Sequence, residues 1–476
     1  MTIEDPITTI TDTVLSPRGF TAELQRRVTG RVVSPSDPDW DEQRLGWNLM
    51  VDQQPAAVVH VESCADVVAA VRFANENGLS VAAQPVGHGA TRALDGAIIL
   101  RLGALQDLDI DIAAGTATVS AGVRWRDLNA ALSGTGLSGL PGSSGDPTVV
   151  GFTLGGGVSW FGRKFGMAAN VVRSFELVTA EGEQITVTRD SYPDLFWALR
   201  GGGGNFGIVT SMEIELVFTG RIYGGRLMWS IDHARELLRA YAEVTASAPA
   251  ELSVWAWVMN VPDVPFVPEP IRGKWMMAID VTFLGSPTDA EDLLAPLHEV
   301  AAPALGELGT VPLADVGLIA AEPEDPTPGL IAAELLTGFD HEIIDALLDV
   351  IAIGEPGELA MFGIRHLGGA FARSSARDGA CGHIAEPYML VFGDIIFAPE
   401  LAAPAQARID GVRRALAPYT GERVPSNFRD DEHAELIHPA DVLDRLRAIK
   451  RQVDPRGVIR GNKVLGDALP VVGQTQ

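Results

Sequence analysis

Short apolar runs, each bounded by a turn or a helix-start signal, fill the first part of the chain. Residues 57–61 and 79–83 are apolar runs of strand length. Between them, Ser63 and Asp66 signal the start of an amphipathic helix, and Gly78 marks its end. This order predicts a βαβ unit. The loop after its second strand then lies where α/β sheets usually bind ligands.

The apolar pattern changes near residue 220. Before it, residues 172–187 predict a hairpin that turns at Glu181-Gly182, and residues 190–200 predict a short helix. After it, strand-like runs (225–230, 252–260, 274–284, 361–367, 388–396) are interspersed with helical segments (233–248, 289–300, 342–353). Because they do not alternate as βαβ units, they predict an α+β domain with a mixed or antiparallel sheet. A helix is expected at 440–452 in the tail.

Composition limits the class of protein. A chain of 476 residues is too long for one simple hydrophobic core, so we expect two or three domains. Its content of 46% hydrophobic and 21% charged residues is typical of globular proteins. With 36 basic and 62 acidic residues the net charge is −26, which argues against nucleic acid or an anionic membrane as partner. Cys64 and Cys381 have no metal-ligand spacing. No signal peptide or membrane span is recognisable, so we expect a cytoplasmic monomer or homodimer.

His88 carries the most specific signal in the chain, because it stands between two glycines directly after an apolar run. Glycines allow the backbone to turn with its N–H groups converging on an anion such as a pyrophosphate. They also leave the imidazole open to an incoming ring system. A histidine in this setting is most often a plain turn residue. A nucleophilic histidine on a phosphate-binding loop is, however, what a covalently held flavin requires.

Two other glycine-rich segments differ in their meaning. Gly202-x-Gly204-x-x-Gly207 matches the dinucleotide fingerprint by letter, but it follows a helix and opens a strand. The fingerprint needs the order strand, turn, helix, so a nicotinamide site is rejected here. Residues 134–157 are glycine-rich and poor in charge. They can bring many backbone N–H groups against one flat ligand, although a plain loop between subdomains is the alternative.

Taken in order, these segments resemble the berberine-bridge-enzyme-like branch of the vanillyl-alcohol oxidase / p-cresol methylhydroxylase superfamily. The resemblance rests on Pro55-Ala56, the predicted helix at 63–77, Gly87-His88-Gly89, residues 149–157, Arg163-Lys164-Phe165-Gly166, residues 193–210 (PDLFWALRGGGGNFGIVT), Asp454-Pro455 and Asn462. The stretch 193–210 is specific on its own, and His88 stands in register with it.

The resemblance implies an α+β fold and an FAD cofactor. A two-part FAD-binding domain of the p-cresol methylhydroxylase type is expected from residues 20–220 and the returning tail 421–476. An α/β substrate domain with a mostly antiparallel sheet is expected at 221–420. His88 would be bonded to the 8α-methyl carbon of the flavin. The implied FAD-binding residues are Pro85, Val86, Gly87, His88, Gly89, Ala90, Gly142, Ser143, Ser144, Thr148, Val150, Gly151, Leu154, Gly155, Gly156, Val209, Asn427 and Asn462.

The chain departs from the family pattern at two places. Gly145-Asp146 stands where some members carry a cysteine that forms a second bond to the flavin, so we expect a single histidyl link. Pro425-Ser426-Asn427 stands where many members carry Tyr-x-Asn, so the catalytic tyrosine is missing. Arg365-His366 and Tyr388 are the polar residues within apolar runs. We take His366 and Tyr388 as candidates for the base, although either could be an ordinary buried residue of a strand.

These features predict an FAD-dependent oxidase. It would remove hydride from an alcohol or amine carbon of a small or medium-sized secondary metabolite, with O2 as acceptor and H2O2 as product. The missing tyrosine keeps an alternative open, namely a non-redox cyclase or isomerase of natural-product biosynthesis in which the flavin is structural. A binding protein that keeps the fold without turnover is a second alternative, and it predicts a purified chain without flavin.

Overall fold

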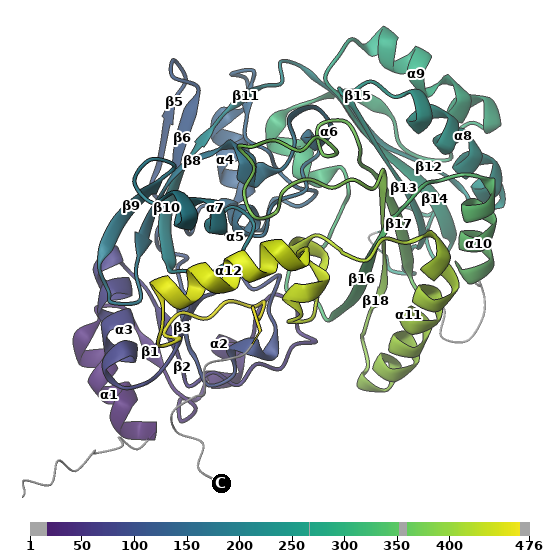
Figure 1. The fold of residues 1–476 in the computed structure, drawn as a ribbon. Helices are drawn as coiled ribbons and strands as arrows, with labels where there is room; N and C mark the ends of the chain where they lie inside the picture. The colour runs from purple at the N-terminus through teal and green to yellow at the C-terminus, as the bar shows by residue number, and fades with distance from the viewer. Residues whose placement is uncertain (1–16, 266, 352–358, 467–476) are drawn as a thin grey trace, which may run out of the picture.

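Four β-sheets organise the computed structural model, which describes residues 17–265, 267–351 and 359–466 (Figure 1). The first has four strands in the order β1 (Val32–Val33), β2 (Ala57–His60), β4 (Ile98–Arg101) and β3 (Val81–Ala83). Helix α3 (Cys64–Glu76) connects β2 to β3, and the Ser63 side chain caps it by accepting from the Asp66 N–H. β2 and β3 both pair in parallel with β4, which lies between them. The expected βαβ unit therefore encloses a third strand.

A five-stranded antiparallel sheet stands beside the first. Its order is β5 (Leu108–Asp111), β6 (Thr116–Ser120), β10 (Ile208–Glu215), β8 (Val172–Val178) and β9 (Gln184–Thr188). The hairpin between β8 and β9 turns at Gly182, whose φ is +75°. Helices α4 (Trp125–Leu132), α5 (Val149–Leu154), α6 (Gly162–Phe165) and α7 (Pro193–Leu199) follow its strands, and β7 (Leu137–Ser138) pairs with β11 (Val217–Phe218).

The largest sheet has seven antiparallel strands. Its order is β15 (Leu308–Val311), β12 (Ile222–Ser230), β14 (Trp275–Phe283), β13 (Leu252–Asn260), β17 (Met361–His366), β18 (Tyr388–Ile395) and β16 (Gly329–Leu336). Figure 1 shows helices α8 (Ala234–Ser247), α9 (Pro287–Val300), α10 (His341–Ile351) and α11 (Ala402–Leu416) on its outer face. The expected α+β class with a mostly antiparallel sheet is confirmed.

Side-chain alternation gives this sheet two different faces. On β13, Val254, Ala256 and Val258 pack in the core under the outer helices, whereas Trp255 and Trp257 belong to the core shared with the first half of the chain. Neighbouring residues on a strand point to opposite faces. The sheet therefore presents one face to its helices and the other to the flanking sheets, where the cavity described below lies.

The tail returns to the first sheet. Helix α12 (Ala440–Val453) lies across α7, where Arg445 donates to Asp194 at 2.8 Å (Figure 1). Beyond it, Ile459 forms a parallel bridge with Val81 on β3. The sequence-based domain limits at 220 and 420 stay a prediction, but this bridge joins the tail to one of the first strands of the chain. None of the helices described is long and apolar enough to cross a bilayer.

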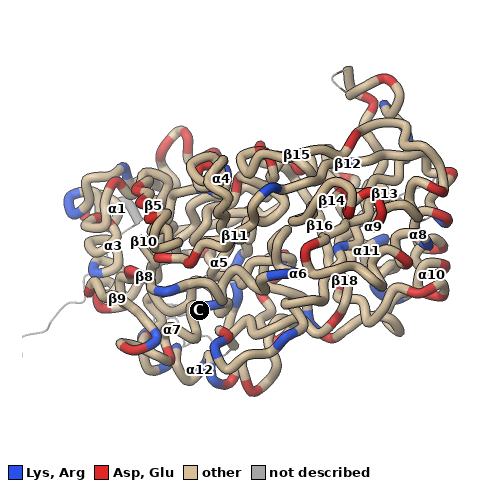
Figure 2. The backbone as a smooth tube through the Cα atoms, turned by 90° about the horizontal axis from the view of Figure 1, so that it is seen from above, with Lys and Arg blue, Asp and Glu red and all other residues tan. Residues whose placement is uncertain are grey.

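The net negative charge is spread over the fold. In Figure 2, Asp and Glu positions occur on elements from both ends of the molecule, from α1 (Pro17–Arg27) and β9 to α9 and α10, with Lys and Arg between them. The charge of −26 is thus a property of the folded body as a whole. Such a distribution disfavours polyanionic partners by long-range repulsion.

Candidate functional site

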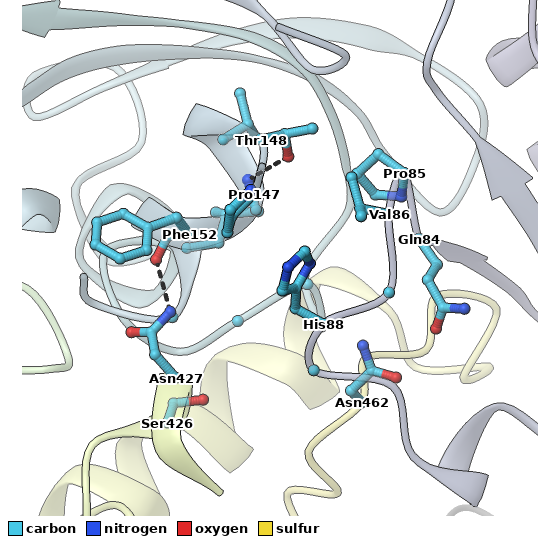
Figure 3. Close-up of a pocket in the computed structure, with 18 of the residues that line it drawn as sticks. Gln84, Pro85, Val86, His88, Pro147, Thr148, Phe152, Ser426, Asn427 and Asn462 are labelled. Carbon is cyan, nitrogen blue, oxygen red and sulfur yellow. Dashed lines mark hydrogen bonds between the residues drawn. The ribbon is translucent and has the colours of Figure 1, made fainter. Parts of the chain in front are cut away.

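A cavity of about 310 Å³ lies where the first sheet, the glycine-rich segment, the tail and the seven-stranded sheet meet (Figure 3). Its walls come from segments far apart in sequence. They are the loop after β3 (83–89), residues 142–155, the loop between α7 and β10 (203–207), residues 426–428 and 461–463, and Glu322 with Arg365. Only the folded chain brings these segments together, which marks the cavity as the candidate site.

The His88 loop is fixed from behind by a close backbone contact. Gly87 has φ +98°, and a Cβ there would lie 2.7 Å from the Gly46 Cα, so only glycine fits. The Trp47 N–H donates to the Val86 carbonyl at 3.0 Å. The Trp47 ring stacks on the His88 imidazole with centroids 4.4 Å apart and planes 14° apart. The imidazole is thereby held in one plane, and Figure 3 shows it pointing into the cavity between Thr148 and Pro85.

The two nitrogens of the His88 ring have different surroundings. Nε2 lies 3.5 Å from the Asp146 Oδ2, while Nδ1 is buried without a hydrogen-bond partner. Burial, and to a lesser extent the charge of Arg124, lowers the pKa of His88 to about 4. The ring is therefore neutral at physiological pH, with a lone pair available. A neutral imidazole with an unpartnered buried nitrogen is suited to bond formation with an incoming group.

The long glycine-rich segment is held by a residue from the tail. The Asn427 Oδ1 accepts from the Gly157 N–H at 2.9 Å, and its Nδ2 donates to the Phe152 carbonyl at 3.0 Å (Figure 3). A Cβ on Gly155 would lie 2.7 Å from this amide, which explains the glycine there. Thr148 caps the short helix α5 by accepting from the Gly151 N–H at 3.2 Å. The segment is thus a fixed wall whose single charged residue, Asp146, is buried.

The loop 203–207 also belongs to the cavity. Gly203, Gly204, Asn205 and Gly207 line it, although their order in the chain excludes a nicotinamide fingerprint. The Asn205 side chain ties this loop to the tail, since its Oδ1 accepts from the Gly461 N–H at 3.2 Å. A Cβ on Gly204 would meet no atom within 4 Å. Small residues at this wall leave room for a flat ligand.

Opposite these loops, the seven-stranded sheet contributes an ion pair. Arg365 on β17 is 3% exposed and donates from Nη2 to the Glu322 Oε1 at 3.0 Å. The guanidinium lies 4.2 Å from the Trp255 ring and 4.9 Å from the Phe428 ring, and its Nε has no partner. Glu322 is 29% exposed, and it is the single carboxylate among the described residues that line the cavity.

A second buried ion pair supports the first. The Asp280 carboxylate accepts from Arg226 at 2.5 and 2.7 Å and from the Trp257 Nε1 at 2.8 Å. Burial raises the pKa of Asp280, and Arg226 opposes that rise. Trp257 in turn lies 5.7 Å from the Arg365 guanidinium. Each buried charge therefore has a partner of opposite sign, as burial in a low dielectric requires.

The two residues expected to act as the catalytic base, His366 and Tyr388, do not line this cavity. His366 follows Arg365 on β17 and therefore points to the opposite face, where its Nε2 lies 2.8 Å from the Arg163 Nη1. The Tyr388 hydroxyl lies 2.8 Å from the Thr245 Oγ1, in the core under the outer helices. Arg365, noted beside His366 in the sequence, is the polar residue that faces the cavity. The choice between adjacent positions depends on which strand face is turned inward.

Most of the expected FAD-binding residues do line the cavity. They are Pro85, Val86, Gly87, His88, Gly89, Gly142, Ser143, Ser144, Thr148, Val150, Gly151, Leu154, Gly155, Val209, Asn427 and Asn462. Ala90 and Gly156 do not line it. Ala90 lies just past the loop, and Gly156 (φ +106°) is turned toward Cys381. Sequence reasoning missed Glu322, which lies in an irregular loop without a motif.

His366 has a consequence for stability. Burial lowers its pKa to about 2, whereas a histidine in the unfolded chain takes up a proton near pH 6.5. The unfolded state therefore binds more protons as the pH falls below 6.5, and the free energy of unfolding decreases. We expect a loss of up to about 1.4 kcal/mol per pH unit from this residue between pH 6 and 4. The measurement is denaturant unfolding over that pH range.

His366→Gln is expected to make this acid-dependent loss shallower. The matched control is His341→Gln at the exposed start of α10. It should leave the slope unchanged, because this side chain is exposed in the folded protein. Equal slopes in the two variants would contradict the assignment of the loss to His366.

The comparisons with known proteins agree with this geometry. Residues 55–188 match the family model described as FAD binding domain. An FAD-linked oxidoreductase of Bacillus subtilis is 25% identical over 461 residues, covering 91% of this chain and 96% of that protein. The (R)-6-hydroxynicotine oxidase of Paenarthrobacter nicotinovorans is 33% identical over 206 residues, which cover 43% of this chain and 45% of that protein.

Solved structures share the fold. The 6-hydroxy-D-nicotine oxidase of Arthrobacter nicotinovorans matches with a TM-score of 0.78 and 24% identity, covering 92% of this chain and 98% of that chain. The berberine-bridge-enzyme-like protein 1 of Physcomitrella patens matches with a TM-score of 0.81 and 20% identity. The match covers 94% of this chain and 100% of that chain.

Fold and cavity together define a flavoprotein oxidoreductase with a p-cresol methylhydroxylase-type FAD-binding domain. The match to the FAD-binding model confirms the predicted cofactor class. These matches agree with the resemblance to the berberine-bridge-enzyme-like branch of the vanillyl-alcohol oxidase / p-cresol methylhydroxylase superfamily, and residues 55–188 match an FAD-binding domain.

Proposed function

We propose that this protein is an oxidase with a single covalent histidyl–FAD bond at His88. It would remove hydride from an alcohol or amine carbon of a small or medium-sized secondary metabolite in the cytoplasm. Each turnover would transfer two electrons and one proton as hydride, while a second proton leaves the substrate O–H or N–H. Dioxygen would accept both electrons and both protons as H2O2.

The orientation of His88 carries this proposal. Its ring points into the cavity, its Nδ1 is buried and unpartnered, and Trp47 holds its plane. Where a second, cysteinyl bond would form, the chain has Asp146, and the described residues that line the cavity include no cysteine. These observations support one bond to the cofactor.

Different residues of the chain would bind the cofactor and the substrate. Backbone N–H groups of residues 86–89 would hold the pyrophosphate, and residues 142–155 would lie along the ring system. When bound, FAD would supply the hydride acceptor. Glu322 is placed to take the substrate O–H or N–H proton, and Arg365 to orient the same polar group. Trp255 and Phe428 cover the guanidinium and limit the access of water.

The test is a screen of alcohols and amines for peroxide release, followed by anaerobic mixing with each active compound. Bleaching of the flavin absorbance is expected within a turnover, because two electrons enter the ring system and no acceptor removes them. Product formation with an unchanged spectrum would favour the non-redox alternative, which the missing tyrosine at Pro425-Ser426-Asn427 keeps open. A purified protein without yellow colour would contradict both.

A further inference from the structure

A buried carboxylate faces the ring of His88. Asp146 is 2% exposed, and its Oδ2 lies 3.5 Å from the His88 Nε2. No other group in the described chain hydrogen-bonds to this oxygen. Asp146 belongs to the 142–155 segment, whereas His88 follows β3, so the contact joins two walls of the cavity.

The two oxygens of Asp146 have separate roles. Oδ1 accepts from the Arg124 guanidinium and from the Arg126 Nη2, the latter at 2.9 Å. Two guanidinium groups offset the cost of burying this carboxylate. They also cancel much of its field, which is consistent with a His88 pKa that burial and Arg124 lower. Oδ1 thus contacts the two guanidinium groups, and Oδ2 faces the His88 imidazole.

This arrangement selects one form of the imidazole. A carboxylate opposite Nε2 favours the tautomer with the proton on Nε2. The lone pair is then on Nδ1, the nitrogen that is buried without a partner. Stacking on Trp47 prevents the ring from leaving this orientation.

We propose that Asp146 is the positioning residue for covalent flavin attachment at the His88 Nδ1, an inference that rests on the covalent bond proposed above. The new N–C bond would replace one C–H bond of the 8α-methyl group, whose proton would leave and whose electron pair bound FAD would accept. Asp146 would balance the positive charge of the imidazole until the Nε2 proton leaves. Dioxygen would take the two electrons and two protons as H2O2, so atoms and electrons balance.

The experiment measures acid-stable flavin in purified protein during incubation with added FAD. Wild type is compared with Asp146→Asn and with Glu324→Gln. Glu324 pairs with the Arg126 Nη1 at 2.9 Å but lies outside the cavity, so its variant disturbs the same cluster without touching His88. We expect Glu324→Gln to attach flavin at the wild-type rate. Asp146→Asn should bind FAD but attach it about 10- to 100-fold more slowly, the usual effect of removing a carboxylate that orients a histidine.

Arg124→Gln separates positioning from a structural role. It breaks one of the two guanidinium pairs of Asp146, leaves the pair with Arg126, and removes a cation that disfavours charge on the imidazole. Flavin attachment in Arg124→Gln should be as fast as in wild type or faster. If Asp146→Asn does not fold, the attachment rate of Arg124→Gln is the measurement that tests the inference. Slowing in Arg124→Gln would overturn the inference, as would an unchanged rate in Asp146→Asn. Absence of acid-stable flavin from wild type would instead contradict the proposed covalent bond itself.

Discussion

His88→Ala is expected to bind FAD but to release all of it on acid denaturation, whereas wild type stays yellow. The pyrophosphate and ring walls are built mainly from other residues, so the cofactor should still bind without its bond. Mass spectrometry of the tryptic peptide that contains residue 88 checks this, because the wild-type peptide should carry the added mass of one FAD. The effect is all-or-none, which makes it the largest expected here.

The matched control is His341→Ala. His341 is exposed at the start of α10, far from the cavity walls. It should retain acid-stable flavin at the wild-type level. Acid-stable flavin in His88→Ala would show that another residue forms the bond.

Glu322→Gln is expected to lower the rate of flavin reduction by about 10²- to 10⁴-fold, the range for loss of a general base. The amide keeps the size of the side chain and can still accept from Arg365, but it cannot take a proton. Flavin content should not change, since Glu322 lies on the side of the cavity formed by the seven-stranded sheet. The measurement is stopped-flow bleaching under anaerobic conditions with a substrate found by the peroxide screen.

Glu324→Gln again serves as the control, two residues further along the same loop. Its carboxylate pairs with Arg126 and does not line the cavity, so the rate should stay within about twofold of wild type, as expected for an exposed substitution. Wild-type reduction by Glu322→Gln would exclude this carboxylate as the proton acceptor and leave Arg365 as an orienting group alone.

The local signals in the sequence were sufficient to bring together the residues of the loops on one side of the cavity. Gly87 and Gly155 are required by backbone approaches within a loop, and such requirements are visible as glycine patterns. The capped helix after Ser63 and the hairpin at Gly182 follow from equally local rules. For that reason the His88 loop, the 142–155 segment and Asn427 could be predicted together.

The side of the cavity formed by the seven-stranded sheet could not be predicted in the same way. β17 is buried on both faces, so its sequence lacks the polar alternation that would show that Arg365 and not His366 faces the cavity. β16 contains Ala, Glu and Leu, which favour helix, and is a strand because it pairs with β18. α11 contains Pro404 and Gly411, which hide its helical pattern. In each case long-range packing decides the outcome.

The tail contact has a consequence for biosynthesis. Asn427 and Asn462 hold walls of a cavity whose first residues lie near position 83. A ribosome-bound chain that still lacks its last fifty residues has neither side chain in place. Loading of the prosthetic group must therefore follow release of the finished polypeptide. A translation product that lacks residues 427–463 would emerge without colour, so the absorbance of the purified protein doubles as a check that this part of the tail is in place.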